Sequence, residues 1–325
     1  MNMKEVDFKK IISEFFRDYL VLVAIILLVL VTMIVEPRFS SIQNMTNIMR
    51  QFGPLSLVSL GMTFVIIGGF IDLSVAGIFS LVCVVTVSLI DPIGQIPAML
   101  VGLLVGVICG LMNSFLILSA GALTQAEALF ITFGMSMITG AFALFITGGM
   151  VLNFSDLQSN FSVFTSIGSG TVGMFPVSLL IFAVALVVLY FFQSKTIMGR
   201  TISLTGGNKT AAQLTGLSVK GSIMVIYALS GFLTALGAMN QFARTTTASP
   251  VMGKGFETNA ILAVVVGGTT LKGGKGSVLR TLMGTLLIIL MSNCLNLLGV
   301  SSFMQNVTKG AILVIAIWLD NRKPL

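Results

Sequence analysis

The chain contains no histidine and has few charged residues, and both shortages narrow what it can be. Of its 325 residues only 9% are charged and 56% are hydrophobic, whereas a soluble domain carries about 25% charged residues. The mean hydropathy is +1.05. This composition indicates a membrane protein.

The missing histidine also limits the chemistry. Without it the chain lacks the commonest metal ligand and general base, and neither a Ser-His-Asp nor a Cys-His arrangement is possible. The three cysteines, Cys83, Cys109 and Cys294, lie inside apolar runs at spacings that fit no metal site. We therefore predict buried, inert thiols, no metal site and no enzyme active site.

Apolar runs dominate the chain and predict an all-α polytopic membrane protein with about ten transmembrane helices. Two regions are expected to be broken or re-entrant, because glycine pairs interrupt them: Gly68–Asp72 and the short eighth span. The polar stretches are too short for a separate soluble core, so residues 1–325 are expected to form one transmembrane domain. The predicted spans are 19–35, 50–68, 73–90, 97–118, 127–147, 175–192, 222–241, 257–268, 279–298 and 303–319.

The distribution of basic residues predicts the orientation. An even number of spans places both termini on one side. Most of the 18 Lys and Arg residues then fall on the side of the N-terminus, as expected for cytoplasmic segments. We therefore expect both termini in the cytoplasm, with 18 N-terminal cytoplasmic residues and a major cytoplasmic loop at about 193–221. Residues 36–49, 148–174 and 242–256 would lie outside.

Glycine spacing in the fourth span predicts close helix packing. Gly102, Gly106 and Gly110 recur every four residues, so they share one helix face and allow a second helix to approach.

The segment "GTTLKGGKG" (Gly268–Gly276) invites comparison with a phosphate-binding loop. The motif requires G-x-x-x-x-G-K-[ST], but Thr269 stands at its first glycine and Gly276 at its Ser/Thr. We expect a turn with cytoplasmic lysines and no ATP site in this chain.

Polar residues within or beside the spans are candidates for a substrate pathway, although helix-to-helix hydrogen bonds are the alternative for each. The acids leave a second function open, an ion-coupled transporter that uses Asp72, Glu127 or Glu257. Asp72 itself is interpreted first as a cap for the span that follows it. The candidates are Asp72, Ser74, Asn113, Glu127, Gln241, Asn293 and Asn296.

The loop at 193–221 contains signals for a short helix. Asn208 is a good N-cap, Gly216 suits a left-handed C-terminal position, and the pair Gly206-Gly207 permits a bend. A helix of two turns is stable only when docked. Either this is a surface turn, or it is a coupling helix that presents Ala211, Ala212 and Leu214 to a cytoplasmic motor.

Several motifs together resemble the ribose-type permease subunits of bacterial ATP-binding-cassette importers. They are "GGFIDLSVAG" from Gly68, "ETNAILAVVVGGTTLKGGKG" from Glu257, "NLLGVSSFMQNVTKGAILVIAI" from Asn296, and the loop pattern formed by Gly199, Arg200, Gly206, Gly207, Asn208, Ala211, Ala212, Leu214 and Gly216.

The resemblance implies a passive permease of the type II-like importer architecture in the bacterial inner membrane. It implies an ATPase subunit that binds ATP and Mg, an external sugar-binding protein, a second permease copy (identical or related) and surrounding lipid, with no cofactor on this chain and no nucleic acid. The cargo would be a monosaccharide or similar small polar solute.

Three departures from the family pattern fall where cargo would pass. "GGFIDLS" has one residue more than the family form before Asp72, a Phe or an Ile. Asn113-Ser114 stands where the family has Asn-Gly in the fourth span, and "LTQAEALFITFG" adds Glu127 near the start of the fifth span.

Overall fold

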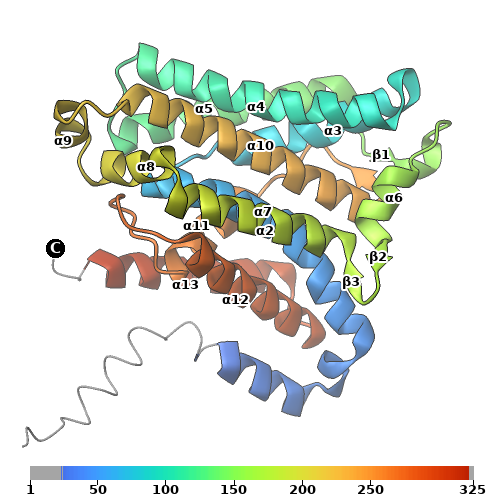
Figure 1. The fold of residues 1–325 in the computed structure, drawn as a ribbon. Helices are drawn as coiled ribbons and strands as arrows, with labels where there is room; N and C mark the ends of the chain where they lie inside the picture. Colours follow the sequence, from blue (N-terminus) through green and yellow to red (C-terminus); the bar gives the residue numbers. More distant parts are fainter. Residues whose placement is uncertain (1–22, 24, 322–325) are drawn as a thin grey trace, which may run out of the picture.

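The computed structural model describes residues 23 and 25–321 and shows a bundle of helices (Figure 1). The predicted cytoplasmic N-terminal residues lie outside the described part, as does the beginning of the first predicted span. Seven of the described helices are long and apolar enough to cross a membrane. They are α2 (Ile42–Ile67), α3 (Val75–Ile93), α4 (Gln95–Ser119), α5 (Gln125–Thr147), α7 (Val177–Lys195), α10 (Val219–Thr245) and α12 (Val278–Leu297).

The remaining predicted spans correspond to other helices. An apolar helix at Ile25–Val35 and α11 (Phe256–Val266) are shorter, and α13 (Ser302–Asn321) closes the described chain. The all-α polytopic fold is therefore confirmed, whereas the count of ten spans is not established. α11 stops at Gly267 and Gly268, as the glycine pair there predicted.

The connections gather at two ends of the bundle (Figure 1). One end holds α8 (Ile197–Gly207), α9 (Lys209–Leu214) and the α4–α5 turn. The other end holds α6 (Ser162–Ser169) and two small antiparallel ladders, Leu152–Asn153 with Thr247–Ala248 and Thr171–Val172 with Phe175–Pro176. It also carries the 3-10 turns η1 (Pro37–Ser40) and η2 (Phe154–Asp156).

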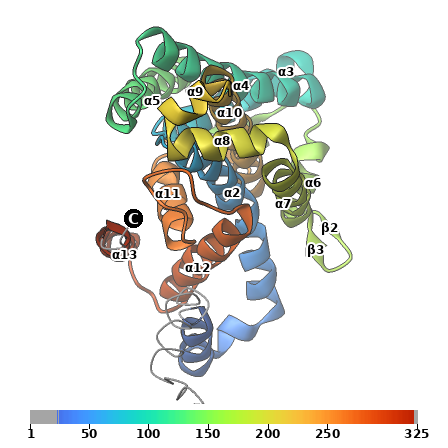
Figure 2. The ribbon, with the colours of Figure 1, turned by 60° about the vertical axis from the view of Figure 1, so that its left-hand side comes forward.

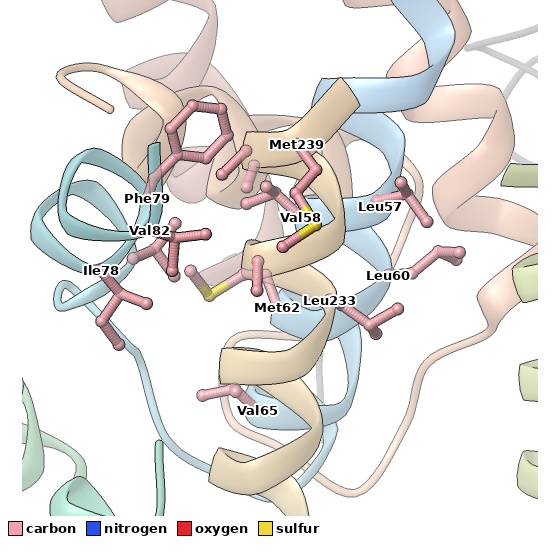
Figure 3. Close-up of a cluster of buried hydrophobic side chains, with 14 of the residues drawn as sticks. Leu57, Val58, Leu60, Met62, Val65, Ile78, Phe79, Val82, Leu233 and Met239 are labelled. Atoms are coloured by element: carbon pink, nitrogen blue, oxygen red, sulfur yellow. The ribbon is translucent and has the colours of Figure 1, made fainter. Parts of the chain in front are cut away.

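The core lies where α2 and α10 meet α3 (Figure 3). Apolar side chains of α2 face those of α3 and α10 there, and they are almost fully buried. By contrast, α4, α5 and α7 carry large apolar side chains on the outside, such as Phe115, Phe130 and Val184. Such a surface suits contact with acyl chains, because lipid does not penalise exposed apolar groups. The core side chains labelled in Figure 3 are Leu57, Val58, Leu60, Met62, Val65, Ile78, Phe79, Val82, Leu233 and Met239.

The glycine face of α4 lies against α10 and α3. A Cβ at Gly106 would lie 2.5 Å from the Gly231 carbonyl oxygen, and one at Gly110 would lie 2.1 Å from the backbone carbonyl oxygen of Tyr227. At Gly102 it would meet the Thr86 hydroxyl at 2.1 Å. These glycines therefore allow the backbones of α4 and α10 to come together.

This contact predicts opposite effects for two equivalent substitutions. Gly106→Ala should lower the free energy of unfolding by about 1–3 kcal/mol, because the added methyl overpacks the contact. In Gly140→Ala the same methyl meets nothing within 4 Å, and alanine is the better helix former by about 1 kcal/mol. Thermal unfolding of both variants in detergent measures the difference. Equal shifts would contradict the close α4–α10 packing.

Candidate functional site

In the α8–α9 segment, each helix begins with a residue whose side chain caps the first turn. Thr196 begins α8 by accepting a hydrogen bond from the Gly199 amide at 3.0 Å. Asn208 begins α9 in the same way, with Oδ1 accepting from the Ala211 amide at 2.9 Å. Gly216 follows α9 with φ +78°, a conformation that glycine adopts without strain. The short helix expected between Asn208 and Gly216 is thus present as α9.

The apolar residues of α9 divide between two faces. Ala212 is buried within the chain, while Leu214 is 84% exposed and Ala211 is also exposed. The sequence analysis grouped all three as one contact surface, because the local sequence does not show that Ala212 packs into the core. Ala211 and Leu214 are the apolar residues of α9 that remain free to meet another protein. Gly199 is buried as well, and a Cβ added at this position would lie 2.3 Å from the Phe192 carbonyl oxygen.

Three glycine pairs that are distant in sequence meet at the end of α8. A Cβ at Gly206 would lie 1.8 Å from the carbonyl oxygen of Ile67, the last residue of α2. The Gly274 amide donates a hydrogen bond to that same oxygen at 2.8 Å. A Cβ at Gly273 would lie 2.8 Å from the Cα of Gly69. We call this contact the glycine junction; it comprises Gly68-Gly69, Gly206-Gly207 and Gly273-Gly274.

A groove of 640 Å³ opens between α8–α9 and the loop that follows α11. Figure 2 shows this end of the bundle, with α8 and α9 in yellow and the loop in orange. The groove walls include Leu204, Asn208, Ala211 and Thr270, together with Lys272 and Lys275. Both lysines are exposed, so the rim of the groove is basic.

The polypeptide between α2 and α3 is not helical and carries a buried acid. Asp72 has no exposed surface. Its Oδ1 accepts from the Ser74 amide at 3.0 Å and from the Ser74 hydroxyl, and its Oδ2 accepts from the Ser230 hydroxyl of α10 at 2.8 Å. Ser74 is the N-cap residue, and its side chain makes no cap bond. Asp72 therefore fixes the residue before the helix and ties it to α10, whereas the sequence suggested a cap of the first turn.

Asn113 of α4 extends this cluster, which we call the Asp72 network: Asp72, Ser74, Asn113 and Ser230. Its Nδ2 donates to the Ser74 hydroxyl at 2.7 Å. The Asn113 Oδ1 and the nearby Tyr227 hydroxyl are buried and have no hydrogen-bond partner among the described residues. The sequence places Ser230 among the membrane-embedded polar residues but does not reveal its bond with Asp72, because the two residues are 158 positions apart.

A cavity of 160 Å³ lies between α2, α10, α11, α12 and α13. Gln241 lines it, whereas the fully buried members of the Asp72 network do not. Its wall combines polar side chains with the ring of Phe256 and the apolar Ile288. The polar and basic lining residues are Gln51, Gln241, Arg244, Asn259, Ser292 and Lys309.

Two other amide candidates join helices. Asn293 of α12 exchanges hydrogen bonds with Asn44 of α2, at 2.8 and 3.1 Å. Asn296 accepts from Gln305 of α13 at 2.7 Å. These bonds satisfy polar groups inside the bundle, which is the helix-to-helix alternative.

The three acids of the ion-coupling alternative are engaged in different places. Asp72 belongs to the buried network. Glu127 is exposed and forms a capping box with Thr124 at the start of α5. Glu257 accepts from the Gly255 amide at 3.0 Å at the start of α11. Within the described part of the chain, these three acids share no hydrogen-bond partner.

Residues 44–317 match the family described as the permease component of the branched-chain amino acid transport system. This match covers most of the chain. The chain belongs to this permease family.

Within this permease family, the chain is similar to transport proteins over almost its whole length. It is 35% identical to the ribose import permease of Haemophilus influenzae, over 95% of each chain. It is 36% identical to that of Bacillus subtilis, over 91% of this chain and 90% of the relative. It is 32% identical to the D-allose transport system permease of Escherichia coli, over 87% and 84%. No solved structure matches it.

Membership of this permease family confirms that the chain is a multi-pass membrane protein and that it is not an enzyme, because a separate subunit hydrolyses ATP. The structure explains why the segment 268–276 is rich in glycine although it fails as a phosphate loop. Gly273 and Gly274 have φ of +83° and +76° and lie against α2 and α8. Their conformation serves packing between segments of the permease.

The glycine junction predicts different outcomes at two adjacent positions. Gly206→Ala should destabilise the permease by about 1–3 kcal/mol, because its methyl collides with the α2 and loop backbones. Gly207→Ala should have little effect, since only the Gly274 Cα lies within 4 Å, at 3.9 Å. Thermal unfolding and limited proteolysis of the 267–277 loop measure both variants. The junction is refuted if Gly207→Ala is as disruptive as Gly206→Ala.

The Asp72 network predicts a graded response at one position. Asp72→Asn keeps an oxygen for Ser74, and the Ser230 hydroxyl can rotate to accept, so insertion and folding should survive. Asp72→Leu should cost about 1–3 kcal/mol or more, because it leaves the Ser74 and Ser230 donors buried without partners. Unfolding of both variants tests the structural role. Loss of uptake in a stably folded Asp72→Asn variant would instead show that the charge is required.

Proposed function

We propose that the chain is the membrane subunit of an ATP-driven importer and forms the pathway for a monosaccharide or similar small polar solute. The observation that carries this proposal is the near full-length similarity to ribose and D-allose permeases. The cargo would be delivered by an external sugar-binding protein. The ATP and Mg would be bound by a separate ATPase subunit.

The α8–α9 end is proposed to face the cytoplasm and the ATPase. Two observations support this orientation: Leu214 is exposed on α9, and the groove rim is basic, as the positive-inside rule expects of a cytoplasmic surface. Both termini would be cytoplasmic, and ten spans would result, if Ile25–Val35, α11 and α13 each belong to a segment that crosses the bilayer.

The opposite end is proposed to receive the binding protein. The 160 Å³ cavity offers amide and hydroxyl groups beside an aromatic ring, a combination that suits a sugar, because hydroxyls need hydrogen bonds and the ring covers an apolar face. Gln241 would then contact cargo. A second permease copy, identical or related, would complete the pathway within the lipid.

The glycine junction provides a route from ATP hydrolysis to the pathway. Closure of the ATPase would displace α8 and α9. Because Gly206 touches the end of α2, the displacement would reach the α2–α3 break and the Asp72 network, which also engages α4 and α10. A rigid shift of these helices would alternate access to the cavity.

Leu214 provides the test of this function. In the importer reconstituted with its ATPase and binding protein, Leu214→Glu should sharply reduce uptake per ATP hydrolysed, because a charge replaces the exposed apolar contact. Leu214→Met is the matched control and should transport normally. Chain-dependent uptake that ignores ATP but stops when the ion gradient collapses would contradict the proposal and favour an ion-coupled transporter.

A further inference from the structure

Lys209 is the first residue of α9, and its side chain turns back into the bundle. Its Nζ lies 3.8 Å from the centroid of the Phe70 ring. The same ammonium donates a hydrogen bond to the Leu123 carbonyl oxygen in the α4–α5 turn, and the Glu127 carboxylate attracts it. Lys209 thus links α9 with two segments that are distant in sequence.

Phe70 connects this contact to the Asp72 network. It is fully buried in the α2–α3 break, two positions before Asp72. Its ring packs beside Tyr227 of α10, with centroids 6.1 Å apart. A displacement of Phe70 therefore also moves Asp72, because only Ile71 separates the two residues along the chain.

Apart from Lys209, α9 has few side chains that hold it against the rest of the bundle. Six residues are too few for an isolated helix, and Ala212 is the one side chain of α9 that is buried. Partial burial of Lys209 has a cost: it lowers the pKa of the ammonium, and the attraction of Glu127 opposes that shift. Lys220 at the start of α10, by contrast, has an exposed side chain.

We propose that Lys209 is a positioning residue that fixes α9 to the α2–α3 break and delivers the displacement of α9 to Phe70. The transmission half of this proposal rests on the proposed function, in which α9 meets the ATPase. The anchoring half concerns the permease chain alone. Two departures from the family pattern border this contact: Phe70 lies in the lengthened "GGFIDLS" segment and touches the Lys209 ammonium, and the Glu127 carboxylate attracts that ammonium.

Anchoring is tested on the purified permease without partners. Lys209→Ala keeps a strong helix former at this position but removes the contact with Phe70. Hydrogen exchange of the α9 amides, followed by mass spectrometry, should accelerate roughly 3- to 30-fold, the range that corresponds to one cation–π contact. Lys209→Arg should restore protection, and Lys220→Ala should leave it unchanged.

A double-mutant cycle identifies the partner. After Phe70→Leu, which keeps an apolar side chain, Lys209→Ala should accelerate exchange by a clearly smaller factor than in the parent chain. Unchanged exchange in Lys209→Ala, or the same factor in both backgrounds, would overturn the anchor.

Transmission is tested in the reconstituted importer. Lys209→Ala should retain ATPase activity and lose uptake per ATP, and Lys209→Arg should recover it. Normal uptake per ATP in a Lys209→Ala variant with accelerated exchange would overturn transmission. If the parent chain shows no ATP-dependent uptake, the proposed function fails, whereas the exchange measurements still decide the anchor.

Discussion

The contact of three backbones at Gly206 is the constraint on which the arrangement of this end of the permease depends. The Ile67 carbonyl oxygen ends α2, accepts from the Gly274 amide, and occupies the space where a Cβ at Gly206 would lie. Backbones at such distances cannot move independently, because packed contacts of this kind shift together or separate. This contact joins three segments into one unit: the end of α2, the end of α8 and the loop after α11.

Polar groups inside the bundle follow a second constraint, since an unsatisfied polar group in a low-dielectric interior is costly. The Asn44–Asn293 pair and the Asp72 network meet this demand by bonding between helices. Asn113 Oδ1 and the Tyr227 hydroxyl lack such partners among the described residues. They mark the place where a rearrangement of α4 and α10 could form new bonds, close to the α2–α3 break.

Local signals predicted much of this structure, and contacts between distant segments explain the rest. The cap Asn208, the left-handed Gly216 and the break at Gly68-Gly69 were readable, because each depends on the backbone preferences of a few neighbouring residues. The burial of Ala212 and the hydrogen bond between Asp72 and Ser230 could not be predicted from the sequence, since both depend on which helices become neighbours. The three glycine pairs were recognised singly as breaks and turns, and only the fold shows that they meet.

The proposed route from the ATPase to the pathway requires the glycine junction to move as one unit when the ATPase acts. It is tested by spin-label distances in the reconstituted importer, with labels at Thr210 on α9, Lys272 in the loop after α11, and Met174 at the opposite end. On binding a non-hydrolysable ATP analogue, the Thr210–Met174 distance should change while the Thr210–Lys272 distance stays constant. If the Thr210–Lys272 distance changes as much as the Thr210–Met174 distance, α9 and the loop after α11 move separately and the glycine junction is not one rigid unit.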